Sequence, residues 1–87
     1  MIHPEIIRFI ETIRETDEKA MVEYYTNGGC YRFFLILGFL GKATPWYDGN
    51  HVITELNGRY YDITGEVEKT DRHTHIEHWQ AAELLRR

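Results

Sequence analysis

The fold is decided by the stretch HVITELNGRYYDIT, residues 51–64. Two runs rich in β-branched and aromatic residues flank Asn57-Gly58. This is the strongest short-range signal of a β-hairpin, because both turn residues tolerate the positive φ angles of a type I′ turn. A two-residue loop here pairs Leu56 with Arg59 and fixes every pair further along the strands. The stretch therefore predicts two antiparallel strands in one register.

The same register predicts a contact between a histidine and a carboxylate. Ile53 comes opposite Asp62, and His51 shares the face of Ile53 because side chains alternate along a strand. His51 and Asp62 are then diagonal neighbours, about 7–8 Å apart at the backbone and closer at their tips. A slip of one residue would put them on opposite faces. We expect a hydrogen bond between them.

The single cysteine, Cys30, follows a Thr-Asn-Gly-Gly turn and opens an apolar run. The run predicts a helix over residues 30–40, ended by Gly41 and buried in the middle of the fold because it is apolar on nearly every side. A buried strand is the competing interpretation of its first half. With an amphipathic helix over residues 4–16 and a C-terminal helix, we expect an α+β fold. Its central, Cys30-bearing helix would pack on a small antiparallel sheet formed by the hairpin at 51–64.

The segments between these elements are interpreted from turn residues and caps. Residues 20–25 are either a short extended piece or a helical turn. Residues 42–50 contain proline and glycine and predict a loop. Thr74 with Glu77 forms a capping box that would start the C-terminal helix. That helix would direct toward the core the side chains of Ile76, Trp79, Ala82 and Leu85.

Cys30, His51 and Asp62 form the candidate catalytic group. The amides at a helix start stabilise a thiolate, and an imidazolium lowers the thiol pKa further. Asp62 would hold the imidazole tautomer and support its positive charge. We expect the three groups to converge at the amino end of the helix, open to solvent, as nucleophile, general base and orienting acid.

Residues near this group are candidates for binding an oxyanion or a substrate. The backbone amide of Cys30 supplies one oxyanion donor. Asn27 is the first candidate for the second donor, followed by the hydroxyl of Tyr24 or Tyr25. Trp46, with the tyrosine after it, either lines a substrate pocket or packs over the small core.

Composition narrows the functional classes. The 87 residues are expected to form a single domain, 1–87, with a net charge of -4 and 43% hydrophobic residues. Acidic and basic residues are interspersed without a basic stripe, which argues against nucleic acid as a partner. A lone cysteine fits a reducing compartment, and the sequence has neither an apolar stretch of membrane-spanning length nor a signal-peptide pattern. We expect a cytoplasmic protein with no membrane partner.

Three histidines, His73, His75 and His78, form a second cluster. A His-x-His pair with another imidazole three residues on can bind zinc or nickel. With Thr74 as a helix cap, only His75 and His78 share a helical face, so solvated residues at a helix start are the better interpretation. We expect neither a metal nor another cofactor.

The order of the candidate residues resembles a known superfamily. A cysteine opening the central helix, a histidine on one strand and an aspartate on the next resemble the papain-like and transglutaminase-like enzymes. The segment from the Gly-Gly-Cys turn to the Tyr-Tyr-Asp strand also looks like short phage and prophage proteins. The resemblance implies Cys30 as nucleophile, His51 as general base and Asp62 as orienting acid. Members cleave peptide or isopeptide bonds, or transfer acyl groups from glutamine amides.

Two hypotheses of function follow. The first is a cysteine-dependent hydrolase or acyltransferase that acts on an amide of a protein or peptide substrate. The second is a non-catalytic phage-type protein that binds and inhibits a host protein through its acidic surface and the loop around Trp46. A homodimer that completes a cleft is compatible with both hypotheses.

Overall fold

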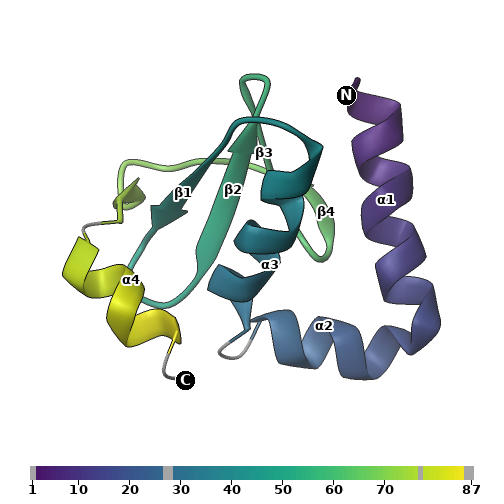
Figure 1. The fold of residues 1–87 in the computed structure, drawn as a ribbon, viewed down its shortest axis with the longest axis horizontal. Coiled ribbons are helices and arrows are strands. Elements are labelled where there is room, and N and C mark those ends of the chain that lie inside the picture. Colours follow the sequence, from purple (N-terminus) through teal and green to yellow (C-terminus); the bar gives the residue numbers. More distant parts are fainter. Residues whose placement is uncertain (1, 27–28, 77, 86–87) are drawn as a thin grey trace.

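The computed structural model describes residues 2–26, 29–76 and 78–85. In chain order the elements are α1 His3–Thr16, α2 Glu18–Thr26, α3 Cys30–Leu37, the 3₁₀ turn η1 Gly38–Leu40, β1 Ala43–Tyr47, β2 Val52–Leu56, β3 Arg59–Asp62, β4 Gly65–Val67, β5 Thr74–His75 and α4 His78–Leu85. Figure 1 shows α1, α2 and α3 before the sheet, with α4 at the other end of the chain. The predicted α+β fold, with the Cys30 helix packed on an antiparallel sheet, is confirmed.

The first two helices precede the sheet. The predicted helix over residues 4–16 is α1, with its proline in the first turn, where the missing N–H costs no hydrogen bond. Residues 20–25, for which the sequence left two interpretations open, are helical and belong to α2. In the part of the chain that the structure describes, none of the helices has the length and apolarity needed to cross a membrane.

The five strands form one antiparallel sheet in the order β4-β3-β2-β1-β5. The hairpin register is the predicted one, with Leu56 opposite Arg59 and the next two pairs in step. Asn57 and Gly58 have φ angles of 54° and 80°, as a type I′ turn requires. The sheet extends beyond the predicted hairpin by three strands, because β1, β4 and β5 add to its two sides.

The prediction of a loop over residues 42–50 is wrong for its first half, which forms β1. Each residue of β1 pairs with one of β2, whereas β5 reaches only Trp46 and Tyr47. At Pro45 the strand is therefore an edge of the sheet, where a residue without an N–H is tolerated. Pro45, which suggested a loop, is thus the last residue of β1 before the two that pair with β5.

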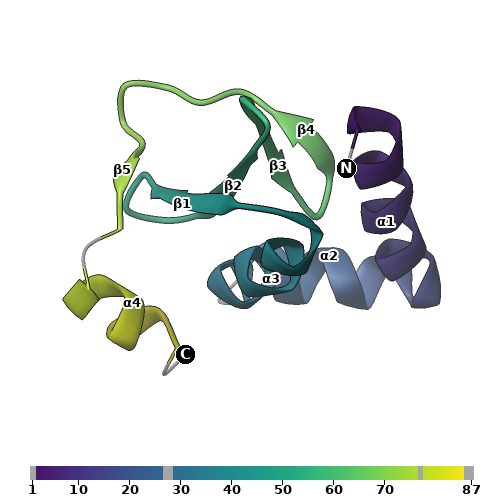
Figure 2. The same cartoon turned by 45° about the horizontal axis from the view of Figure 1, so that its top comes forward.

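Helix α3 packs on one face of the sheet, and the connection between β4 and β5 passes over the other (Figure 2). The helix continues as η1 to Leu40, which matches the predicted extent. Its buried face carries Cys30, Phe33 and Leu37, spaced as one side of a helix. The expectation that it is buried all round is wrong: its outer side faces away from the sheet, and Phe39 at its end is 89% exposed.

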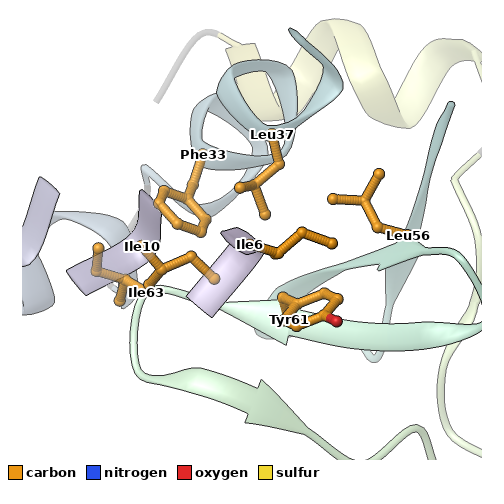
Figure 3. Packing of buried hydrophobic residues seen from close by; sticks show 7 residues of the cluster. All are labelled: Ile6, Ile10, Phe33, Leu37, Leu56, Tyr61 and Ile63. Atoms are coloured by element: carbon orange, nitrogen blue, oxygen red, sulfur yellow. The ribbon is translucent and has the colours of Figure 1, made fainter. Parts of the chain in front are cut away.

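The main core lies between α1, α3 and the sheet (Figure 3). We call this group the structural cluster. It consists of Ile6, Ile10, Phe33, Leu37, Leu56, Tyr61 and Ile63. Its one polar atom, the hydroxyl of Tyr61, lies 2.7 Å from Nδ1 of His3, so the buried phenol keeps a partner. The contact also joins the first turn of α1 to β3.

The C-terminal region differs from its prediction. Thr74 lies in β5, opposite Tyr47, and its hydroxyl donates a hydrogen bond to the Tyr47 carbonyl, so it caps no helix. The backbone of Thr74 pairs with β1, and α4 begins only at His78. Glu77, the other half of the expected capping box, lies outside the described residues. The buried side of α4 also differs from the predicted one, because Leu84 is buried while Ala82 and Leu85 are exposed. Ile76 is half-buried, and the side chain of Trp79 lies outside the description.

Candidate active site

His51 and Asp62 form the expected hydrogen bond. Nε2 of His51 lies 3.0 Å from Oδ2 of Asp62. His51 directly precedes β2, and Asp62 is the last residue of the antiparallel neighbour β3. The register set by the Asn57-Gly58 turn therefore brings the two side chains to the same end of the sheet.

The second oxygen of Asp62 is held by the turn that follows β3. Oδ1 accepts hydrogen bonds from the backbone N–H of Thr64, at 2.7 Å, and from the Thr64 hydroxyl. Burial is the largest single influence and would raise the pKa of this carboxyl, but the hydrogen bonds from His51 and Thr64 outweigh it, and the pKa of Asp62 is lowered. Asp62 is therefore an oriented carboxylate at neutral pH.

The other ring nitrogen of His51 is not used by Asp62. Among the residues that the structure describes, Nδ1 of His51 is the buried side-chain nitrogen or oxygen without a hydrogen-bond partner. Cys30 interacts with the ring strongly enough to shift the pKa of both groups. The thiol and the imidazole are thus close enough to influence each other's pKa.

The protonation states of the pair follow from their surroundings. The hydrogen bond with Asp62, followed by the interaction with Cys30, raises the pKa of His51 to about 9. Burial acts most strongly on Cys30 and would raise the pKa of the thiol. His51 and the backbone amides of Val52 and Tyr31 outweigh burial, so the pKa of Cys30 is lowered. Both shifts favour the pair of thiolate and imidazolium over the pair of neutral groups.

The thiol is covered, which contradicts the expectation that it is open to solvent. Cys30 is 4% exposed and packs with Val52 of β2 and Leu84 of α4, a group that we call the thiol cluster. Helix α4 is further tied to α3 because Nη2 of Arg32 donates a hydrogen bond of 3.0 Å to the carbonyl of Leu85. Leu84 is therefore one of the side chains that shield the sulfur from solvent.

A close backbone approach sets the start of α3. The N–H of Gly29 donates a 2.9 Å hydrogen bond to the carbonyl of Tyr24. A Cβ at Gly29 would lie 2.7 Å from a ring carbon of Tyr24 and 2.8 Å from its carbonyl oxygen, so only glycine fits without a shift. The second glycine of the Gly-Gly-Cys turn therefore positions the thiol at the amino end of the helix.

The three residues proposed as a second oxyanion donor are placed as follows. Asn27 lies outside the described residues, and its role stays a prediction. The ring of Tyr25 packs at 5.1 Å from that of Phe33, beside the structural cluster, and Tyr24 makes an edge contact with Tyr25. These ring contacts account for the places of both tyrosines, and a role for their hydroxyls stays a prediction.

Trp46 lies in β1 and belongs to a separate group of side chains. Its indole N–H donates a 3.0 Å hydrogen bond to Glu55, and its ring lies 4.1 Å from that of His75. The ammonium group of Lys69 lies 4.7 Å from the ring centre. Its role in binding a substrate stays a prediction.

The histidine cluster does not have the helical geometry expected for it. His75 lies in β5 against Trp46, and His73 lies in the preceding loop, where it faces Asp48. The side chain of His78 is outside the description. Across residues 2–26, 29–76 and 78–85, no group of three histidine, cysteine, aspartate or glutamate side chains is arranged to hold a metal ion.

Three residues near the thiol and His51 were missed by the sequence analysis. Leu84 packs on the thiol, Asp48 accepts a hydrogen bond from the backbone N–H of His51, and His73 faces Asp48. Asp-Gly-Asn directly before His51 is a signal that could have identified Asp48, because aspartate in such turns accepts backbone N–H groups.

Comparison with known families adds an assignment. Residues 6–85 match the family described as Phage YunG-like protein. The chain belongs to this family. Searches of the curated proteins and of the solved structures gave no match. The family assignment identifies a phage-type protein, and the chemistry of the site has to be argued from its own geometry.

Proposed function

We propose that this Phage YunG-like protein is a cysteine-dependent hydrolase or acyltransferase that acts on an amide of a protein or peptide. The observation that carries the proposal is the position of His51, which is held by Asp62 through Nε2 and leaves Nδ1 for Cys30. A nucleophile, a base and an orienting carboxylate in this order are the elements of thiol-based acyl transfer. The same order supports the resemblance to the papain-like and transglutaminase-like enzymes.

The reaction follows from the protonation states. The thiolate of Cys30 attacks the amide carbonyl carbon, and the negative charge moves to the carbonyl oxygen near the first amides of α3. The imidazolium of His51 gives its proton to the leaving amine as the carbon–nitrogen bond breaks, which leaves a thioester on Cys30. His51 then takes a proton from water or from an acceptor amine as that nucleophile attacks the thioester, and the sulfur leaves as the thiolate, which restores the starting pair of thiolate and imidazolium. Asp62 keeps the ring oriented throughout.

Substrate access is part of the proposal. Because Leu84 packs on Cys30, the reaction requires α4 to move away from α3 or Leu84 to change its rotamer. The reducing cytoplasm is the compartment that suits this chemistry, since the lone thiol stays reduced there.

The test uses p-nitrophenyl acetate, an activated ester that reports on a nucleophilic thiol without a known substrate. We expect an acetyl group on Cys30, detected by mass spectrometry of the folded protein, and slower acetylation in His51→Gln. Cys30→Ser provides the blank for other nucleophiles. A folded wild-type protein whose thiol reacts no faster than that of a cysteine peptide would contradict the proposal.

A second function, inhibition of a host protein by binding, is favoured by one observation. Leu35 and Phe39 are exposed on the outer side of the segment formed by α3 and η1, one helical turn apart. If the protein acts only by binding, Cys30→Ser would leave its effect on a host cell unchanged, and Phe39→Asp would reduce that effect. The reverse result would support the enzyme.

A further inference from the structure

We propose that Asp48 is a positioning residue for His51 and that His73 in turn holds Asp48. The proposal rests on the proposed function, because it concerns the geometry of the same imidazole. It assigns a role to a second aspartate–histidine pair, Asp48 and His73, which lies beside the candidate site. Neither residue takes part in the proton transfers of the proposed reaction.

Asp48 binds the backbone at the point where the chain enters β2. Its Oδ1 accepts hydrogen bonds from the N–H groups of Asn50, at 2.9 Å, and of His51, at 2.8 Å. The ladder between β1 and β2 ends at the pair Tyr47–Val52, so His51 lies one residue beyond it. The carboxylate of Asp48 therefore replaces the strand partner that the N–H of His51 lacks.

His73 faces the other oxygen of this carboxylate, at a distance longer than a hydrogen bond but short enough for electrostatic attraction. Nε2 of His73 lies 3.8 Å from Oδ2 of Asp48. Nδ1 of His73 accepts a 3.0 Å hydrogen bond from the backbone N–H of Thr70, which requires the neutral ring to carry its hydrogen on Nε2, toward Asp48. His73 is buried, and its own N–H donates to the Thr70 carbonyl at 3.1 Å, so the loop that presents it is closed by backbone contacts.

The chain of contacts reaches the reacting groups. The loop after β4 fixes His73, His73 attracts the carboxylate of Asp48, and Asp48 binds the backbone N–H of His51, whose ring interacts with Cys30. The ionisable groups that act on His51 come from three elements: Asp62 from β3, Cys30 from α3 and Asp48 from the turn before β2. Loss of the Asp48 contact would let the ring shift relative to the thiol, and the thiolate would lose its partner.

The experiment measures the thiol directly by NMR. The ¹³Cβ chemical shift of the single cysteine is followed against pH in the wild type, Asp48→Ala and Asp48→Asn. We expect Asp48→Ala to raise the pH midpoint of Cys30 by about one unit, which corresponds to a tenfold weaker preference for the thiolate. Asp48→Asn keeps an oxygen acceptor for the two N–H groups, so we expect it to retain most of the wild-type midpoint. Asp71→Ala, in the same loop as His73 and exposed, is the matched control.

The outcomes separate this proposal from the function on which it rests. A wild-type thiol that titrates like that of a free cysteine would contradict both the role of Asp48 and the proposed function. A lowered wild-type midpoint that Asp48→Ala leaves unchanged removes only the role of Asp48, and a fall in thermal stability without a change of midpoint would show that Asp48 is merely structural. If Asp48→Ala does not fold, His73→Leu serves instead, with a smaller shift expected in the same direction. An unchanged midpoint in that variant would also overturn the proposal.

Discussion

The structural cluster and the thiol cluster share helix α3 but differ in size and in the ionisable groups beside them. The structural cluster joins seven buried side chains from α1, α3 and the sheet, and its one hydroxyl is bonded to His3. The thiol cluster has three buried members among the described residues, Cys30, Val52 and Leu84, and interacts with the imidazole of His51. Phe33 and Leu37 place α3 on the sheet, whereas Cys30 at its amino end packs with a leucine of another helix. The structural core and the proposed reactive thiol thus lie about one turn apart along one helix.

The largest effect is expected from a change within the structural cluster. Leu37→Ala leaves a cavity in a fully buried site and should lower the free energy of unfolding by about 2–5 kcal/mol. Urea denaturation followed by circular dichroism measures it. Leu35→Ala, on the exposed side of the same helix, is the control and should change stability by less than about 1 kcal/mol. Equal losses in the two variants would mean that the two sides of α3 are not distinguished by burial.

Gly29, at the corner before α3, affects both clusters. Gly29→Ala places a methyl group against the Tyr24 carbonyl and ring, and we expect a loss of about 1–3 kcal/mol in the free energy of unfolding. Gly38→Ala is the matched control, because a Cβ there meets no atom within 4 Å and alanine suits a helix end. The denaturation midpoint should therefore fall for Gly29→Ala and not for Gly38→Ala. An unchanged midpoint in Gly29→Ala would disprove the close approach of Gly29 to Tyr24.

The charged part of the thiol cluster should appear in the pH dependence of stability. A folded-state pKa raised from 6.5 to about 9 means that His51 contributes stability fully below pH 6.5 and loses it as pH rises through 9. In the wild type the lowered pKa of Cys30 offsets this trend, because the folded thiolate has already released a proton. The test therefore compares Cys30→Ser with Cys30→Ser/His51→Gln. We expect their difference in unfolding free energy to shrink by about 1–2 kcal/mol between pH 6 and pH 9. A difference that grows with pH would be inconsistent with a raised pKa.

The smallest effect is expected from the cover itself. Leu84→Ala removes the side chain that packs on the thiol and should raise the rate of iodoacetamide labelling of Cys30 at pH 7 by about tenfold, equivalent to about 1.4 kcal/mol of easier access. Leu85→Ala is the control, since that side chain is 41% exposed while its backbone carbonyl still accepts the bond from Arg32. Similar rates for both variants would show that access does not depend on Leu84.

The parts that the sequence predicted are those governed by local rules. Asn57-Gly58 allows one turn type, and the register that follows brings His51 to Asp62. The spacing of the isoleucines in α1 likewise predicts a helix whatever surrounds it. Where a short segment has one favourable backbone solution, its structure can be read from the sequence.

The parts that it missed depend on partners distant in the chain. Strand β5 has two residues and exists only because β1 offers it an edge, so Thr74 was interpreted as a helix cap. That error moved the start of α4 and selected Leu85 as the core residue in place of Leu84. Asp48 and His73 are 25 positions apart, and only the path of the loop after β4 brings them together.

Pro45 has a consequence for how this protein behaves at high concentration. From Ala43 to Pro45 the side of β1 away from β2 has no neighbouring strand within the described residues. A strand of another molecule can pair with an unpaired edge of this kind, which is a route to fibrils. Proline has no backbone N–H to donate to an added strand. Pro45→Thr should therefore make the protein more prone to self-associate while leaving its own sheet intact.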